Sequence, residues 1–269
     1  MLGMSVIHAR AVEALVDGTA TLQNYAPSAS NIPNWGTGWG NGSVNGWSYV
    51  GKVGDGGGIY LGNNWVITAG HVGAGNFVLT SGTYDAVPGS AQGITNSTGT
   101  ADLTLFQIAT APDLPALTIS SSAPVALSAS SPGDMVAMIG YGGGGESWGL
   151  NTVTANDVDA TVEGYSFEST DFETAYGTTT VGSNSATNDA VLISGDSGGG
   201  DFIYNDFTDS WDLAGFNEGV DLTTHDSYMV QLNAYEPQIQ SIISVPEPGG
   251  LVPAGLTLAL WLVSRRRRA

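Results

Sequence analysis

The chain has 269 residues, which is enough for one large all-β unit or two small barrels and excludes a disulfide-stapled mini-domain. It contains no cysteine, which excludes thiol catalysis, cysteine-ligated zinc and structural disulfides. Six basic residues stand against 25 acidic ones, and the only Lys or Arg between Arg10 and Arg265 is Lys52. Because nucleic-acid affinity depends on Lys and Arg that neutralise phosphates, this charge argues against a nucleic-acid partner.

The first two segments have little regular patterning. Residues 1–23 contain a short apolar stretch and the small-x-small pattern Ala9-Arg10-Ala11, which fits either the end of a signal peptide or an ordinary flexible N-terminus. Residues 24–46 are rich in Asn, Gly, Ser and Pro, which predicts a loop or a partly ordered entry to a domain. Three tryptophans could stack on a carbohydrate, but packing is the default expectation for them. They are Trp35, Trp39 and Trp47.

From Trp47 onward, short apolar runs alternate with Gly, Asn and Asp clusters, which predicts strands and turns. The predicted strands are residues 47–53, 58–62, 65–69, 77–80, 103–109, 134–140, 201–205, 211–216 and 228–232. One short helix is expected at residues 233–243, with Asn233 as its cap and Glu236 at the capping-box position. The fold class is therefore all-β with a short C-terminal helix.

The last residues, 244–269, differ from the rest of the chain. Pro246-Glu247-Pro248 precedes an apolar run at residues 251–263, which is followed by Arg265 to Arg268. The run is shorter than the roughly 17–25 residues of an independent membrane span, and the basic cluster would stay cytoplasmic. A buried strand is the alternative interpretation.

This tail resembles the PEP-CTERM sorting signal of Gram-negative bacteria. The resemblance implies export, a transient inner-membrane anchor through the tail, and recognition by an exosortase-type enzyme near Pro246-Glu247-Pro248. The tail would then be removed, leaving the protein in the cell envelope or secreted.

Three segments contain residue types that suit nucleophilic catalysis. Of the three histidines, only His71 stands where a strand-like run meets a Gly-rich turn, in Thr68-Ala69-Gly70-His71. Asp102 begins an alternating apolar strand, although most such Asp residues are turn-formers. Ser197 lies within the Gly-rich stretch from Gly195 to Gly200, and such glycines can expose a hydroxyl and point amides at one spot.

Together these motifs resemble the trypsin/chymotrypsin-like serine protease family, over about residues 57–243. The resemblance implies two packed six-stranded antiparallel β-barrels and a short C-terminal helix. The expected boundaries place the domain at 24–243, the barrels at roughly 44–122 and 123–232, and the helix at 233–243.

The resemblance also implies roles. Ser197 would be the nucleophile, His71 the base that accepts its proton, and Asp102 the residue that orients His71. The oxyanion hole would consist of the N–H groups of Gly195 and Ser197. His71 must be neutral to act as a base, so activity should fall below roughly pH 6 to 7. No cofactor is implied, and the substrate would be a protein or peptide.

Two departures from the family pattern affect activation and the loop after the nucleophile. Gly200 stands where the family has proline. No IVGG-like segment precedes His71, so activation by a new N-terminus that pairs with Asp196 is not expected, and local donors could serve Asp196 instead.

The substrate pocket is expected to accept an apolar or small side chain. Val191, six residues before the nucleophile, would form its base, and the opposite wall would come from Asn217, Glu218 and Gly219. His225 could enter the pocket and favour acidic substrates, but an exposed loop is the default expectation.

No metal site is expected, because the acidic stretch near the hairpin after residue 200 lacks EF-hand spacing and suits a polar hairpin tip. Its aspartates are Asp201, Asp206, Asp209 and Asp212. The sequence thus predicts a secreted or cell-surface serine endopeptidase that works through an acyl-enzyme. Three alternatives stay open: a catalytically inactive protease-like surface or matrix module, an esterase with the same triad, and a peptidase with one narrow envelope partner.

Overall fold

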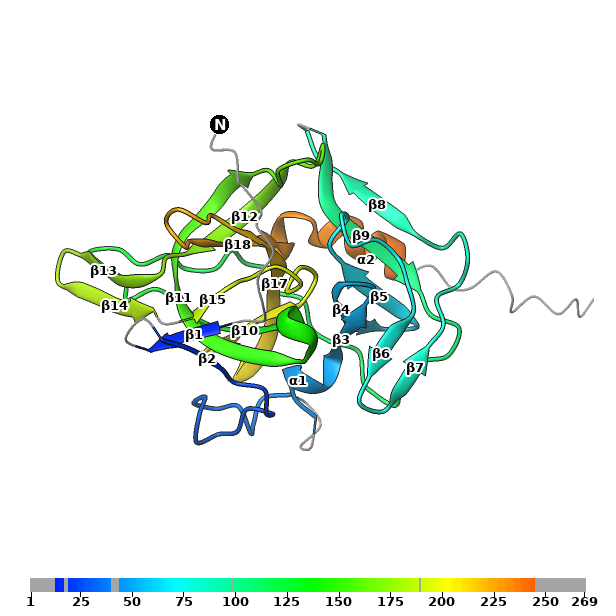
Figure 1. The fold of residues 1–269 in the computed structure, drawn as a ribbon, viewed down its shortest axis with the longest axis horizontal. Helices are drawn as coiled ribbons and strands as arrows, with labels where there is room; N and C mark the ends of the chain where they lie inside the picture. The colour runs from blue at the N-terminus through cyan, green and yellow to red at the C-terminus, as the bar shows by residue number, and fades with distance from the viewer. Residues whose placement is uncertain (1–12, 17–18, 40–43, 98, 189, 245–269) are drawn as a thin grey trace, which may run out of the picture.

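A computed structural model describes residues 13–16, 19–39, 44–97, 99–188 and 190–244, shown as the coloured ribbon in Figure 1. Residues 1–12 and residues 245–269 of the expected sorting tail lie outside the described residues. The described chain is nearly all β, with two β-units side by side. This confirms the predicted fold class.

The first unit is a seven-stranded antiparallel sheet in the order β7-β6-β3-β4-β5-β9-β8. Its strands are β3 (Val50–Val53), β4 (Gly56–Gly62), β5 (Trp65–Thr68), β6 (Phe77–Leu79), β7 (Gly82–Tyr84), β8 (Gln92–Thr95) and β9 (Thr100–Gln107). The unit has seven strands, whereas six were expected. The strands at the two edges of the sheet, β7 and β8, are polar and contain no apolar run, so the sequence does not predict them.

The second unit is a closed six-stranded barrel in the order β10-β11-β12-β18-β17-β16. Its strands are β10 (Met135–Gly140), β11 (Ser147–Ala160), β12 (Ser169–Thr174), β16 (Gly200–Asn205), β17 (Ser210–Val220) and β18 (Ser227–Gln231). This barrel has the predicted strand number. Polar residues separate the apolar residues of its longest strand, β11, so the strand contains no apolar run, and the sequence does not predict it.

Two smaller sheets flank the second barrel. One is the hairpin of β13 (Gly177–Val181) and β14 (Asn184–Asn188). The other pairs β1 (Glu13–Val16) with β2 (Thr19–Leu22) and with β15 (Ala190–Val191). The N-terminal segment, expected to lie outside the domain up to residue 23, therefore adds two strands beside the chain that leads to Ser197.

The helical elements are all short. They are α1 (Gly46–Tyr49), the 3-10 turns η1 (Gly142–Gly144) and η2 (Leu232–Ala234), and α2 (Glu236–Ile243). The predicted C-terminal helix exists, but it begins after Tyr235, because Asn233 lies in η2 and makes no capping hydrogen bond. Residues 47–49, expected as strand, form part of α1. Among the described residues, no helix is both long and apolar enough to cross a bilayer.

The hydrophobic core explains why the two units form one body. One apolar cluster runs from the first sheet, through Ile67 and Phe106, to Phe202 and Phe216 of the second barrel, and includes Ile239 of α2. A second cluster fills the inside of the closed barrel. The two units therefore share buried surface, and the chain between their strands is held at a fixed place.

The tryptophans at the entry to the domain pack on the protein itself. Trp35 is 1% exposed, and Trp39 stacks on Trp211 with ring centroids 5.5 Å apart and planes 4° apart. Trp47 packs against the same core. These contacts support the packing interpretation over carbohydrate stacking.

Candidate active site

The first segment of the site is the turn after β5 that carries His71. The N–H groups of Val72 and Gly73 both donate to the carbonyl of Ala69, which closes a tight turn at the end of the strand. β9 lies next to β5, with Thr68 opposite Thr104, so Asp102 comes beside this turn. Pairing of two neighbouring strands therefore brings together two residues that are 31 positions apart.

Asp102 holds His71 by two contacts. Its Oδ1 accepts the backbone N–H of His71 at 2.7 Å, and its Oδ2 lies 2.6 Å from Nδ1 of the ring. Asp102 is fully buried, and no Lys or Arg side chain among the described residues forms a salt bridge with it. A carboxylate in this position favours the tautomer with its proton on Nδ1, which leaves Nε2 as a proton acceptor.

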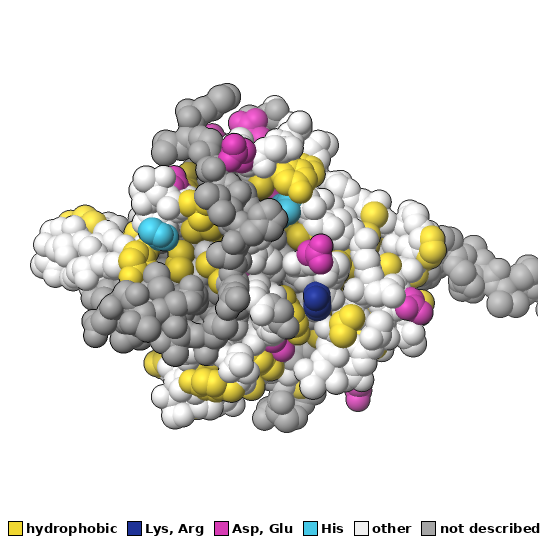
Figure 2. Space-filling model, in the orientation of Figure 1, with side chains coloured by type: hydrophobic (Ala, Val, Ile, Leu, Met, Phe, Trp, Pro, Cys, Tyr) yellow, Lys and Arg dark blue, Asp and Glu magenta, His cyan; other side chains and the backbone are white. Residues whose placement is uncertain are grey.

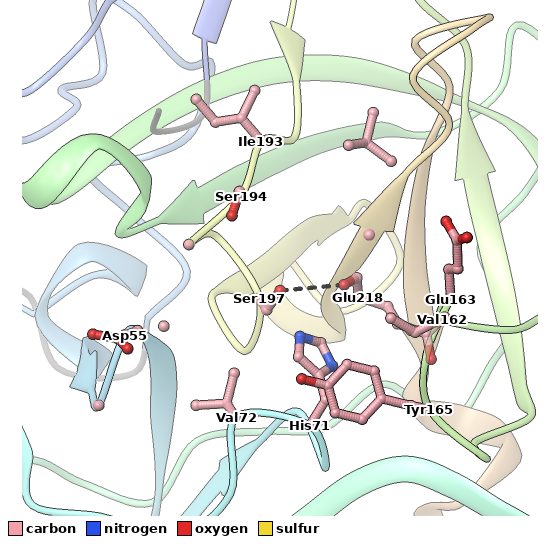
Figure 3. A pocket seen from close by; sticks show the side chains of 15 residues that line it. Asp55, His71, Val72, Val162, Glu163, Tyr165, Ile193, Ser194, Ser197 and Glu218 are labelled. Carbon is pink, nitrogen blue, oxygen red and sulfur yellow. Dashed lines mark hydrogen bonds between the residues drawn. The ribbon is translucent and has the colours of Figure 1, made fainter. Parts of the chain in front are cut away.

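Ser197 lies in the turn between β15 and β16 and faces the same space as His71 (Figure 3). Within the described part of the chain, its hydroxyl donates to the backbone carbonyl of Glu218 at 3.3 Å and makes no hydrogen bond with His71. The carbonyl of Ser197 accepts the N–H of Gly57 at 2.8 Å, which ties this turn to the first sheet. The nucleophile candidate therefore sits at the junction of the two units.

The loop before Ser197 is held by Asp196. Its two carboxylate oxygens accept the N–H groups of Gly142 and Ile193, both at 2.9 Å. Asp196 thus has local donors, and its side chain is fully buried. Gly195 adopts a positive φ of 96°, which favours glycine, and among the described residues neither its N–H nor that of Ser197 has an acceptor. Both amides are therefore free for a ligand oxygen.

A cavity of about 530 Å³ opens over these groups. His71, Ser197 and Gly195 line it together with Glu218 and Gly219, two of the expected pocket residues (Figure 3). Its apolar surface comes from Val72, Val162, Ile193 and Val220. The site is thus a cleft with an apolar wall next to the His–Ser pair.

Two expected pocket residues are placed elsewhere. Val191 is in β15, opposite Glu13 of β1, and its side chain is buried in the core of the closed barrel. Asn217 is fully buried and donates to the carbonyls of Ile139 and Asp196 at 2.9 and 3.1 Å. Neither residue therefore lines this cavity, and Ile193, two positions after Val191, forms part of its apolar wall.

The loop between β11 and β12 was missed as part of the site. It contributes Val162, Glu163 and Tyr165, and the ring of Tyr165 lies 5.2 Å from that of His71. No motif marks this loop in the sequence, and its distance from His71 along the chain hides the contact. Asp55 lies across the cavity from Glu163 (Figure 3), and these two exposed carboxylates make the rim of the cleft acidic.

The remaining candidates do not join the site. His225 is exposed, adopts a φ of 62° and contacts Tyr176. Of the aspartates near the β16–β17 hairpin, Asp201 and Asp212 are buried while Asp206 and Asp209 are at its exposed tip. Within the described ranges, no group of three or more His, Cys, Asp or Glu side chains is arranged to hold a metal.

The closed six-stranded barrel, the adjoining sheet and the cleft at their junction define a trypsin-like double-barrel protein. Residues 56–205 match the family model described as the trypsin-like peptidase domain, and this match covers more than half of the chain. The chain belongs to the trypsin-like peptidase domain family, and it has the fold of a protease.

Solved structures support the fold. Rv3671c from M. tuberculosis H37Rv, as a serine-to-alanine mutant in its inactive form, matches with a TM-score of 0.52 at 15% identity, over 85% of this chain and 100% of that one. The active form of the same protease matches with a TM-score of 0.50 at 16% identity, over 75% and 82% of the two chains. At such identities the likeness concerns the fold alone.

The HtrA-type protease AlgW, solved with a decapeptide, is also similar, with a TM-score of 0.48 at 20% identity. The match covers 71% of this chain, which spans about half (52%) of AlgW. No curated protein sequence matches this chain.

Proposed function

We propose that this chain is a serine endopeptidase that hydrolyses peptide bonds through an acyl-enzyme on Ser197. The observation that carries the proposal is the double contact of Asp102 with His71, at 2.7 and 2.6 Å, beside a cleft that His71 and Ser197 both line. This arrangement supplies a nucleophile, a base with a free Nε2 and a buried carboxylate that orients the base.

In the proposed mechanism, the Ser197 hydroxyl leaves the carbonyl of Glu218 and turns toward Nε2 of His71. Its oxygen bonds to the scissile carbonyl carbon while its proton passes to His71, and the free N–H groups of Gly195 and Ser197 stabilise the oxyanion. His71 then donates that proton to the leaving amine as the C–N bond breaks. Water then bonds to the acyl carbon and passes a proton to His71. The ester bond to Ser197 breaks as His71 returns this proton to the Ser197 oxygen, and the acid is released.

The cleft also supports a substrate preference. Ile193 and Val220 line it, and no Lys or Arg does so among its described lining residues. We expect a small or apolar side chain before the scissile bond. An apolar wall can bury such a side chain without the penalty of desolvating a charge.

The first test is labelling of the full chain with a fluorophosphonate probe at pH 8. We expect the wild type to be labelled and both Ser197→Ala and His71→Ala to lose labelling. Peptide mapping should place the adduct on Ser197 and not on Ser194, the other serine of the cleft. A folded wild-type protein that is not labelled would contradict the proposal and favour an inactive surface module.

A second measurement separates a peptidase from an esterase, since both use the same acyl transfer. Peptide libraries with a fluorogenic leaving group and a simple nitrophenyl ester are compared on the same preparation. Turnover of peptides with a small or apolar residue before the cleaved bond is expected. Turnover of the ester alone would support the esterase or a peptidase restricted to one partner.

We propose further that the protein is exported and that residues 244–269 are a PEP-CTERM signal removed by an exosortase-type enzyme. The support is the order of Pro246-Glu247-Pro248, the apolar run and the Arg cluster in the sequence. Intact-mass measurement of the mature protein from a host with an exosortase should show that the tail is lost. A mature surface protein that retains Arg265 to Arg268 would overturn this assignment.

A further inference from the structure

A chain of hydrogen bonds runs from Asp102 away from His71 into the closed barrel. The backbone N–H of Asp102 donates to Oγ of Ser169 in β12 at 3.0 Å. The Ser169 hydroxyl donates to Oε1 of Glu218 in β17 at 2.7 Å. All three side chains are at most 1% exposed, so water does not compete for these bonds.

Glu218 in turn is paired with a second buried acid. It lies beside Asp171, which is fully buried in β12. Both oxygens of Asp171 and Oε2 of Glu218 have no hydrogen-bond partner among the described residues. Two neighbouring carboxylates that are buried with unpartnered oxygens and no cation repel each other unless one is protonated, so we assign one proton to the pair.

The surroundings of this pair are acidic. The ionisable groups that face it are Asp102 from β9, Asp201 from β16 and His71 from the turn after β5. Burial and the neighbouring carboxylates raise the pKa of both Asp171 and Glu218. Burying two acids without a cation is unfavourable, since an apolar pair would fill the same space without the desolvation penalty.

Glu218 contacts both halves of the site. Its side chain accepts from Ser169, which accepts from Asp102, while its backbone carbonyl accepts from the Ser197 hydroxyl. A serine hydroxyl has one proton, so with that proton on Glu218 the oxygen of Ser169 is free to accept from Asp102. The carboxyl pair therefore fixes the direction of the Ser169 hydroxyl, and that direction fixes the backbone of Asp102.

We propose that Ser169, Glu218 and Asp171 are positioning residues of the His71–Asp102–Ser197 site, with Glu218 and Asp171 acting as a carboxyl pair that shares one proton. The inference rests on the proposed function. The pair contributes in two ways: it orients Asp102 through Ser169, and its single negative charge favours the imidazolium form of His71 in the transition state.

The first experiment tests Ser169 in the full chain, with kcat and KM measured on one substrate. Ser169→Ala should lower kcat by about tenfold to a hundredfold and leave KM within about twofold, because it moves the reacting groups and not the cleft wall. Ser169→Thr keeps the hydroxyl and should restore most of the activity.

Ser90→Ala is the matched control. Ser90 accepts a backbone N–H of the same strand, that of Gln107, also at 3.0 Å, and donates to the carbonyl of Val87. The Ser90→Ala variant should be less stable than the wild type but should keep the wild-type kcat. Equal kcat values for Ser169→Ala and the wild type would overturn the role of Ser169.

The second experiment tests the carboxyl pair by the pH profile of kcat/KM. In Asp171→Asn the amide can still donate to Glu218, so the profile should match that of the wild type. The double variant Asp171→Asn with Glu218→Gln keeps hydrogen-bonding groups but removes the charge. Its plateau should fall severalfold and its acidic limb should move by about half a pH unit to lower pH.

The outcomes separate the two proposals. If fluorophosphonate does not label the wild type, the proposed function fails. If it labels the wild type and the double variant keeps the wild-type profile, the carboxyl pair is a structural feature only and this inference fails. Should a Ser169 variant not fold, the Asp171→Asn and double-variant profiles still decide the role of the pair.

Discussion

At the residue scale, the geometry of Asp102 depends on a glycine. A Cβ added at Gly70 would lie 2.9 Å from Oδ1 of Asp102 and 3.1 Å from the ring of Phe167. The absence of a side chain at Gly70 therefore lets the turn of His71 approach the carboxylate closely enough for both contacts. In the motif Thr68-Ala69-Gly70-His71, the position before the histidine must therefore be glycine, because there is no room for a side chain.

Asp102→Asn should lower kcat/KM by roughly ten-thousandfold. An amide can accept at one oxygen only, so it cannot both take the His71 backbone N–H and hold the Nδ1–H tautomer as a carboxylate does. The measurement is kcat/KM at pH 8 with circular dichroism to verify the fold. Asp85→Asn and Asp113→Asn change exposed aspartates and serve as controls. A loss of activity as large in either control would contradict the assignment of Asp102.

At the element scale, the site is built where the turn after Ser197 meets the β4–β5 hairpin. Gly198 donates to the carbonyl of Asn217, and Thr68 Oγ1 donates to the carbonyl of Gly57 at 2.6 Å. A Cβ at Gly198 would lie 2.3 Å from that carbonyl oxygen of Gly57. Gly198 therefore permits this turn to pack with its backbone against the backbone of β4 in the other unit.

Gly198→Ala should lower the free energy of unfolding by about 3 kcal/mol or more, since it combines an unfavourable positive φ with a clash against backbone. Gly89→Ala is the matched control: its φ of 78° is close to the 81° of Gly198, but nothing lies within 4 Å of the added Cβ. It should lower stability by only about 1–2 kcal/mol. Urea unfolding measures both, and equal losses would contradict the close approach of the two units.

At the scale of the whole molecule, acidity is the main feature. The formal net charge is −19, and on the face in Figure 2 most side chains are uncharged and the charged ones are mainly acidic. Several carboxyls are also buried without cations. Burial raises the pKa of Asp171, Asp201 and Glu218, and raises that of Glu146 to about 8.

These raised pKa values determine how stability depends on pH. A carboxyl with a raised pKa binds its proton more tightly in the folded state than in the unfolded state. Its favourable contribution is complete below the ordinary pKa of about 4 and is lost as the pH rises through the folded-state value. Stability should therefore decline between about pH 4 and pH 8.

Thermal and urea unfolding at pH 5 and pH 8 should show the wild type to be more stable at pH 5. Glu146→Gln should be about 1–2 kcal/mol more stable than the wild type at pH 8 and close to it at pH 5, because the amide needs no proton to stay neutral. Asp113→Asn removes one exposed charge and controls for the net charge. A Glu146→Gln variant with the wild-type dependence on pH would show that Glu146 is not the group responsible.

The sequence by itself predicted the fold class, which the structure confirms, and identified three candidate segments that the fold brings close together. Apolar runs between Gly-rich turns predict an all-β chain, and the segments around His71, Asp102 and Ser197 are local motifs whose residue types follow from tight turns and acyl-transfer chemistry. Each motif is a short stretch of sequence, so it can be identified without knowing which strands pair. The strands that the sequence misses include β11 to β14, in which polar residues interrupt or replace the apolar ones.

Only the tertiary structure decided what surrounds those segments. β15 pairs with β1 and its Val191 is buried, whereas Ile193 lines the cleft. The strands β9, β12 and β17 lie close together, which places Ser169, Asp171 and Glu218 near Asp102. These contacts join residues far apart in the chain. They depend on register and barrel closure, and no short pattern in a single sequence records either one.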